Sequence, residues 1–247
     1  MFLDLTIIAI VLAATSGVPG LFLPRDSRWG ERIAVALMVA ASLAGLAAAF
    51  AGMGGSGSGK DGLIFPWPAT GNGAVGLDPL SAFFLAPVFL MGGLGPVYGL
   101  GYWPQRRHAA NGRKLRLFWG LMVAGMALLM IGRQALTFLL GWEFMALSAF
   151  FLVATEDQRP ESRQAGWIYL IATHVGTLTL FALFALWRQA TGSYALVPAA
   201  PGALSTGTAN LLFVVALLGF GLKAGMMPLH FWLPGAHANA PSHVSAM

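Results

Sequence analysis

Two ionisable side chains lie deep inside long apolar segments of this 247-residue sequence. Glu143 lies in the segment GWEFMALSAFFLV, and Lys223 lies in FGLKAGMMPLHFWLP. A charged residue at the centre of a bilayer costs about 2.5–3.5 kcal/mol, so such residues normally face a protein interior or a wet cavity and mark an ion or proton path. The two residues are therefore candidates for proton transfer. The alternative is a structural ion pair that fixes one helix to another.

The residues that follow Lys223 favour proton chemistry. Pro228 cannot donate a hydrogen bond to the carbonyl of Ala224, and its ring clashes there, which predicts a break in the helix just after the lysine. Broken helices are tolerated at membrane depth only where protein covers them or where they line a water-filled cavity. A carboxylate that moves toward or away from a partly desolvated lysine would make that lysine bind or release a proton.

The histidines form the second group of candidates. His230, His237 and His243 follow the predicted break, and histidine titrates near physiological pH, so a proton relay is chemically reasonable. For His230 and His237 a relay and a structural role are equally compatible with the sequence. His174 lies between threonines in an apolar segment, which favours a hydrogen-bonded structural role. Prolines interrupt the spacings after the break, which argues against a metal site.

The composition determines the class of protein in which these residues lie. Hydrophobic residues make up 57% of the chain and charged residues only 9%, whereas soluble domains have about 25% charged residues. This excludes a cytoplasmic enzyme, a nucleic-acid module and a disordered chain. The absence of cysteine excludes disulfides and cysteine-ligated iron–sulfur or zinc sites within the chain, and we expect no cofactor. The sequence therefore predicts an all-α polytopic membrane protein.

Seven segments are apolar and long enough to cross a bilayer, which takes about 20 helical residues. They cover residues 5–24, 33–59, 79–105, 117–132, 134–155, 164–187 and 209–227. We expect an N-terminal unit of three helices over 1–114, then four helices and the start of an eighth over 115–247. The eighth would open at Pro241 and stop at Met247 in its first turn, as expected of a fragment or a split gene. Asp78 is expected to cap the third helix, and residues 54–62 to form a flexible linker.

The segments GWEFMALSAFFLV, GLKAGMMPLHFWLPGAHANAPSHVSAM and GLDPLSAFF resemble the antiporter-like proton-channel subunits of complex I, Mrp antiporters and energy-converting hydrogenases. The ending APSHVSAM is most similar to the hydrogenase-4 and formate-hydrogenlyase branch, because the wider complex I pattern usually has Thr-Pro in place of Ser242 and His243. The resemblance covers the whole chain and is most specific over residues 124–247. It implies the N-terminal half of a fold with fourteen or more helices and two inverted five-helix repeats.

The resemblance also implies roles for particular residues. Glu143 matches a glutamate that pairs with Lys223 and tunes it, and Lys223 matches the lysine of the first half-channel. His230 and His237 match the histidines that flank the WLP turn. The relay histidine of the eighth helix would fall beyond Met247, and the second half-channel would be absent.

The function that these features imply is that of a proton-translocating membrane-arm subunit of a complex I-like or hydrogenase-type respiratory complex. Its implied partners are the lipid bilayer, other membrane-arm subunits, protons and a peripheral redox module that carries the oxidoreductase chemistry. We expect no nucleic acid. Two alternatives remain: an Mrp-type cation/proton antiporter subunit, and a non-conducting scaffold in which Glu143 and Lys223 only hold helices together.

The loop charges predict the orientation of the chain in the inner cell membrane. Ten basic residues fall in the first, third and fifth loops, namely Arg25, Arg28, Arg32, Arg106, Arg107, Arg113, Lys114, Arg116, Arg159 and Arg163. The other loops hold only three, namely Lys60, Arg133 and Arg188. The positive-inside rule places the first set in the cytoplasm and the N-terminus outside. Tag-accessibility mapping should find residues 106–116 on the cytoplasmic side, and labelling of that loop from outside would contradict this topology.

Overall fold

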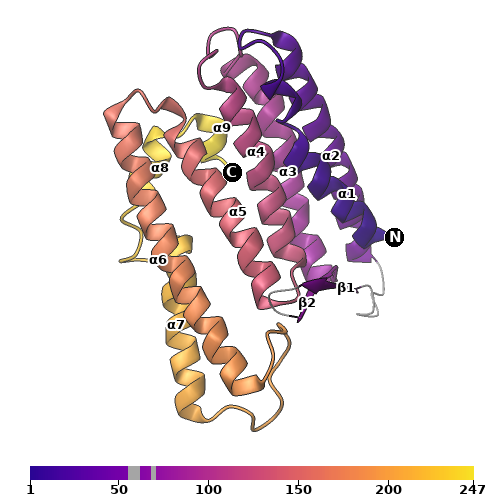
Figure 1. The fold of residues 1–247 in the computed structure, drawn as a ribbon, viewed down its shortest axis with the longest axis vertical. Helices are drawn as coiled ribbons and strands as arrows, with labels where there is room; N and C mark the ends of the chain where they lie inside the picture. The colour runs from indigo at the N-terminus through magenta and orange to yellow at the C-terminus, as the bar shows by residue number, and fades with distance from the viewer. Residues whose placement is uncertain (55–61, 68–70) are drawn as a thin grey trace.

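The computed structural model describes residues 1–54, 62–67 and 71–247, and it is a bundle of long helices with a small hairpin at one end (Figure 1). Seven of the described helices are long and apolar enough to cross a membrane, which confirms the predicted number of spans. They are α1 (Phe2–Thr15), α2 (Arg28–Gly54), α3 (Pro79–Tyr102), α4 (Gly112–Ile131), α5 (Ala135–Val153), α6 (Pro160–Thr191) and α7 (Thr206–Ala224). The linker predicted at residues 54–62 lies outside the described residues except at its two ends.

Four short helical segments and one hairpin complete the described structure. The short segments are η1 (Pro19–Leu21), η2 (Ala154–Glu156), α8 (Leu233–Asn239) and α9 (Ser242–Ser245). Strands β1 (Gly62–Trp67) and β2 (Gly71–Gly76) pair antiparallel with Leu63 opposite Val75. The backbone N–H of Arg133 donates to the carbonyl of Ala74 at 2.9 Å, so the hairpin is tied to the turn between α4 and α5. The sequence analysis did not predict this hairpin.

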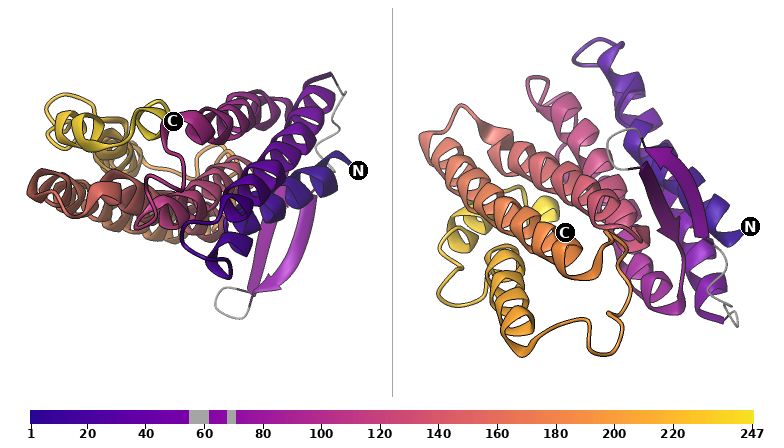
Figure 2. Two further views of the ribbon diagram at one scale, coloured as in Figure 1. Left: turned by 90° about the horizontal axis from the view of Figure 1, so that it is seen from above. Right: turned by 60° about the horizontal axis from the view of Figure 1, so that its bottom comes forward.

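The helices pack in two groups. Figure 1 and Figure 2 show α1 to α5 side by side, with α6 and α7 forming a pair that extends away from them. Small residues allow the closest approach, as is common in membrane bundles. A Cβ on Gly125 would lie 2.6 Å from the backbone nitrogen of Met145, and one on Gly141 would lie 2.7 Å from that of Leu129. These two glycines therefore set the close packing of α4 against α5.

The start of α3 is capped as predicted. The Asp78 carboxylate accepts a hydrogen bond from the backbone N–H of Ser81 at 2.7 Å and forms a salt bridge with Arg133 at 2.8 Å. Burial alone would raise the pKa of the Asp78 carboxyl, but hydrogen bonds from Ser81 and Leu80 and the charge of Arg133 hold it below its ordinary value. The cap thus joins the first turn of α3 to the turn that leads into α5.

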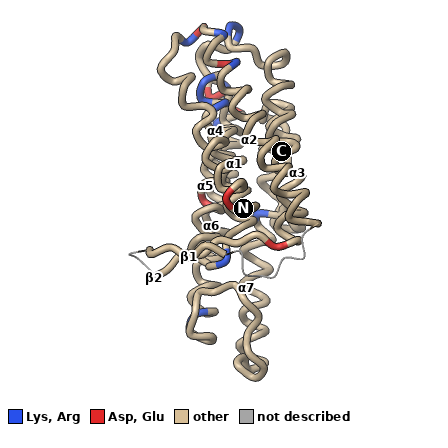
Figure 3. The backbone as a smooth tube through the Cα atoms, turned by 90° about the vertical axis from the view of Figure 1, so that its right-hand side faces the viewer, with Lys and Arg blue, Asp and Glu red and all other residues tan. Residues whose placement is uncertain are grey.

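Charged residues gather at the end of the bundle that carries the α1–α2, α3–α4 and α5–α6 loops (Figure 3). At this end Arg116 of α4 and Glu31 of α2 form an ion pair at 2.7 Å, with only 10% and 7% of their side chains exposed. Gln105 joins the pair, because its backbone N–H donates to Glu31 at 3.3 Å and its side-chain oxygen accepts from Arg116. The pair therefore ties together α2, α4 and the loop after α3.

Removal of one partner from this buried pair should strongly destabilise the protein. Glu31→Ala leaves Arg116 charged and unpaired, and breaking a buried pair costs about 3–5 kcal/mol. Glu156→Ala is the control, since it breaks an exposed pair with Arg159 at 3.1 Å that contributes about 0–1 kcal/mol. Thermal unfolding in detergent should show a lower midpoint for Glu31→Ala than for Glu156→Ala. Equal midpoints would contradict a structural role of the buried pair.

Candidate functional site

The site is built where α7 ends. Lys223 lies in the last turn of α7, and Gly225 follows with φ 68°, a left-handed conformation that glycine adopts without strain. The helix stops at Ala224, four residues before Pro228, and helical structure resumes in α8 at Leu233. The indole N–H of Trp232 donates to the carbonyl of Leu222 at 2.7 Å, which satisfies one of the free carbonyls at the end of α7.

The Lys223 ammonium group bonds to a tyrosine. Its Nζ donates to the hydroxyl of Tyr169 on α6 at 2.5 Å and lies 4.9 Å from the centre of the tyrosine ring. Both residues line a cavity of about 220 Å³ together with His237 and Ser245. A water molecule takes about 30 Å³ in the liquid, so this volume has room for several. The lysine therefore stands between a hydroxyl partner and a space that water can fill.

Glu143 lies on α5 beside His174 of α6. Its Oε2 is 3.8 Å from His174 Nε2, and its buried Oε1 has no hydrogen-bond partner among the described residues. His174 Nδ1 is 3.1 Å from the carbonyl oxygen of Leu170. Because a carbonyl only accepts, Nδ1 must carry a proton, so Nε2 faces the carboxylate either as the N–H of a charged ring or as an acceptor. At 3.8 Å the two groups are neighbours as a charge pair but lie beyond hydrogen-bond distance.

Glu143 and Lys223 form no salt bridge with each other in the described structure. They lie on helices that both pack against α6, and the carboxylate interacts electrostatically with Lys223 and with Tyr169. Tyr169 and His174 are one and a half helical turns apart on α6. Trp142, the residue before Glu143 on α5, packs edge-on against Phe220 of α7 at 5.7 Å, so these two helices also touch directly. The pairing of Glu143 with Lys223 as a direct contact stays a prediction.

The two histidines expected to flank the WLP turn have different surroundings. His237 lies on α8, its Nδ1 is 2.7 Å from the Ser245 hydroxyl, and it lines the same cavity as Lys223. His230 precedes α8 and does not line that cavity, and its buried Nδ1 has no partner among the described residues. Nowhere in the described ranges do three or more metal-ligating side chains come together.

Two residues of the site, Tyr169 and His174, contact the charged side chains although the sequence analysis did not predict it. Tyr169 was not identified from the sequence, because nothing in the local pattern distinguishes it from other aromatic residues of an apolar helix. His174 was expected to be structural, and it does make a hydrogen bond within α6, but it also lies beside Glu143. The two residues are five positions apart on α6, which places Tyr169 beside Lys223 of α7 and His174 beside Glu143 of α5. This spacing was the one sign of their role that the sequence contained.

The chain is similar to known proteins in sequence and in fold. Residues 133–247 match the model of the family described as NADH:quinone oxidoreductase/Mrp antiporter, transmembrane. The chain is 36% identical over 172 residues to hydrogenase-4 component B of Escherichia coli (strain K12), across 69% of this chain and 25% of that protein. It is 29% identical over 175 residues to formate hydrogenlyase subunit 3 of the same organism, across 70% of this chain and 27% of that protein.

A further relative and a solved structure extend the similarity. NADH-quinone oxidoreductase subunit N of Deinococcus radiodurans is 32% identical over 133 residues, across 50% of this chain and 26% of that protein. A chain of an archaeal respiratory membrane complex, the membrane-bound sulfane sulfur reductase, aligns with a TM-score of 0.77 at 17% identity, over all of this chain and 49% of that one. That alignment shows the fold. The family resemblance inferred from the sequence is confirmed, and the chain spans about a quarter of the length of these curated relatives.

Proposed function

We propose, on the premise that residues 133–247 belong to the NADH:quinone oxidoreductase/Mrp antiporter transmembrane family, that this chain forms one proton half-channel of a complex I-like or hydrogenase-type membrane complex. It lies in the inner cell membrane with its N-terminus outside, residues 1–114 forming a first helical unit and 115–247 the start of the channel repeat. Other membrane-arm subunits and a peripheral redox module are its partners. The observation that carries the proposal is the Lys223 ammonium group held between Tyr169 and the cavity.

The arrangement supports control of Lys223 by the charge on Glu143. When His174 carries the proton and Glu143 is ionised, the negative carboxylate favours a charged Lys223. When the proton sits on the carboxylate, that attraction is lost and Lys223 releases a proton to the cavity. His237 faces the same cavity and is the next acceptor. Tyr169 holds the ammonium group in place during the exchange, because its hydroxyl remains an acceptor.

Replacement of Lys223 should abolish proton translocation. Lys223→Ala removes the titrating group, and Lys223→Arg should impair the process as well, because a guanidinium does not release its proton at accessible pH. Proton uptake by inverted vesicles and native-gel assembly of the complex should be measured with and without sodium. Dependence on sodium would favour the Mrp-type antiporter that the same family model covers.

The control for the lysine variants is Lys114→Ala. It removes a lysine whose salt bridge with Asp157, at 3.0 Å, is partly exposed at the loop end of the bundle. We expect normal assembly and normal proton uptake for this variant. Proton uptake at the wild-type rate in an assembled Lys223→Ala complex would refute the proposal.

A neutral replacement of Glu143 separates tuning from a structural role. Glu143→Gln keeps the size of the side chain but removes the charge, so we expect an assembled complex with impaired proton uptake. Glu143→Asp keeps the charge at a shorter reach and should retain part of the activity. If the residue only stabilised the helices, Glu143→Gln would lower assembly while uptake per assembled complex stayed unchanged, and this result would support the non-conducting scaffold.

A further inference from the structure

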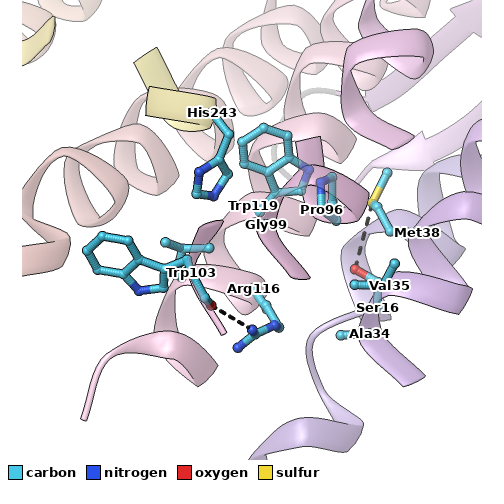
Figure 4. A pocket seen from close by; sticks show the side chains of 11 residues that line it. Ser16, Ala34, Val35, Met38, Pro96, Gly99, Trp103, Arg116, Trp119 and His243 are labelled. Carbon is cyan, nitrogen blue, oxygen red and sulfur yellow. Dashed lines mark hydrogen bonds between the residues drawn. The ribbon is translucent and has the colours of Figure 1, made fainter. Parts of the chain in front are cut away.

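A second, much smaller cavity lies at the end of the bundle where the buried Arg116–Glu31 pair is found. Its volume is about 20 Å³, and helices from both ends of the sequence enclose it (Figure 4). The polar and aromatic side chains that line it are Ser16, Trp103, Arg116, Trp119 and His243. A cavity needs about 10–15 Å³ to hold one water molecule. This cavity therefore has the size of a single-water site.

The buried ring nitrogens of His243 need a hydrogen-bond partner, which a ligand in this cavity would supply. The residue lies on α9 and only 5% of it is exposed, yet neither ring nitrogen has a hydrogen-bond partner among the described residues. Figure 4 shows its ring between Trp119 and Trp103, directed toward the side of the cavity where Arg116 lies. An unpaired buried polar group costs about 1–3 kcal/mol, and ordered water commonly satisfies such groups. The imidazole lacks a partner, and the space beside it fits one.

The other walls supply polar partners for such a water. The Ser16 hydroxyl donates to the carbonyl of Ala13 at 2.7 Å, so its oxygen is still able to accept a hydrogen bond. Arg116 donates to Glu31 at 2.7 Å and to the carbonyl of Trp103 at 3.2 Å, and it borders the cavity. A water needs two to four polar partners to be retained in a protein interior. Three groups with free hydrogen-bonding capacity line this cavity, His243, Ser16 and Arg116, and Figure 4 shows Ser16 on the side away from His243.

We propose that this cavity binds one ordered water and that His243, reached through that water, is a second protonatable residue of the half-channel. The proposal rests on the proposed function and adds to it a residue outside the Lys223 cavity. A proton that reaches the cavity as a protonated water passes to a ring nitrogen of His243: one O–H bond breaks, one N–H bond forms and neutral water remains. The reverse transfer restores the protonated water. The titratable groups nearest the ring are Arg116, which lines the same cavity and pairs with Glu31, and Tyr98 and Tyr102, whose ring centres lie 6.3 and 5.8 Å from that of the imidazole. Burial and the charge of Arg116 lower the pKa of His243 to about 4, so the ring is neutral at neutral pH and carries a proton only transiently.

The position of α9 connects this site with the Lys223 cavity. Val244 and Ser245 directly follow His243 and line the larger cavity, where Ser245 bonds to His237. One short helix thus forms part of the wall of both cavities. A charge gained at His243 is therefore placed to act on the lysine site through this shared wall.

Two glycines of α3 offer a matched pair of variants. A Cβ on Gly99 would lie 3.8 Å from His243 Nε2, at ordinary contact distance, whereas a Cβ on Gly101 would meet no atom within 4 Å. Gly99→Ala should therefore narrow the water site without disturbing the fold, and Gly101→Ala makes the same change without reaching it. His243→Leu removes the protonatable group itself.

The experiment uses the full complex in its membrane. We expect His243→Leu to slow proton uptake about tenfold or more, the scale on which loss of a proton-transfer group acts. Gly99→Ala should show a smaller loss in the same direction, and Gly101→Ala should show none. A high-resolution map of the wild-type complex should show one water within hydrogen-bond distance of a His243 ring nitrogen.

The outcomes separate this inference from the proposed function. An empty cavity in a map that resolves water around Lys223, or normal proton uptake in assembled His243→Leu, would overturn the inference. If Lys223→Ala abolishes uptake while the His243 and Gly99 variants match the wild type, only the inference fails. If the wild-type complex moves no protons, the proposed function fails, and the map still decides whether the water site exists.

Discussion

The cost of burying charge in an apolar medium is the constraint on which this structure depends. An ionised side chain pays several kcal/mol to leave water unless a partner or water solvates it. Lys223 meets that cost with the Tyr169 hydroxyl and a cavity, and Arg116 meets it with Glu31 and the groups around Gln105. The two sites differ in whether the charged group adjoins space that water can fill. The arginine is enclosed by fixed partners, whereas the lysine adjoins open volume.

The open volume exists because the chain stops being helical at Gly225. A continuous α7 would run straight past α6. The left-handed conformation of Gly225 ends the helix instead, and α8 and α9 fold back toward the bundle. Trp232 then bonds to the freed carbonyl of Leu222 and packs against the Tyr169 ring at 5.2 Å. The residues that end the helix thus also build the wall of the cavity, so the backbone break and the lysine site form one feature.

The sequence allowed the spans, the Asp78 cap and the family to be predicted, because each depends on local composition or on a contiguous motif. It did not allow the contacts of the charged residues to be predicted. Whether Glu143 reaches Lys223 or His174 depends on the rotation of α5 against α6, which glycines such as Gly125 and Gly141 set through packing with α4. The β1–β2 hairpin was missed for a similar reason, since Val75 gains its burial only from the bundle end that it covers.

Glu143 and Lys223 each have a partner on α6 and, in the part of the chain that the structure describes, form no salt bridge with each other. A direct Glu143–Lys223 salt bridge would hold both charges in one low-energy state and resist the loss of a proton, as buried pairs do. In the structure His174 of α6 lies beside Glu143 and Tyr169 of α6 bonds to Lys223, although α5 and α7 also touch directly where Trp142 meets Phe220 at 5.7 Å. Charges interact more strongly in apolar surroundings than in water, so under the proposed function a change of charge on Glu143 would act on Lys223 without a direct contact. Separate partners on α6 therefore leave Glu143 and Lys223 without the permanent pairing that a direct salt bridge would impose.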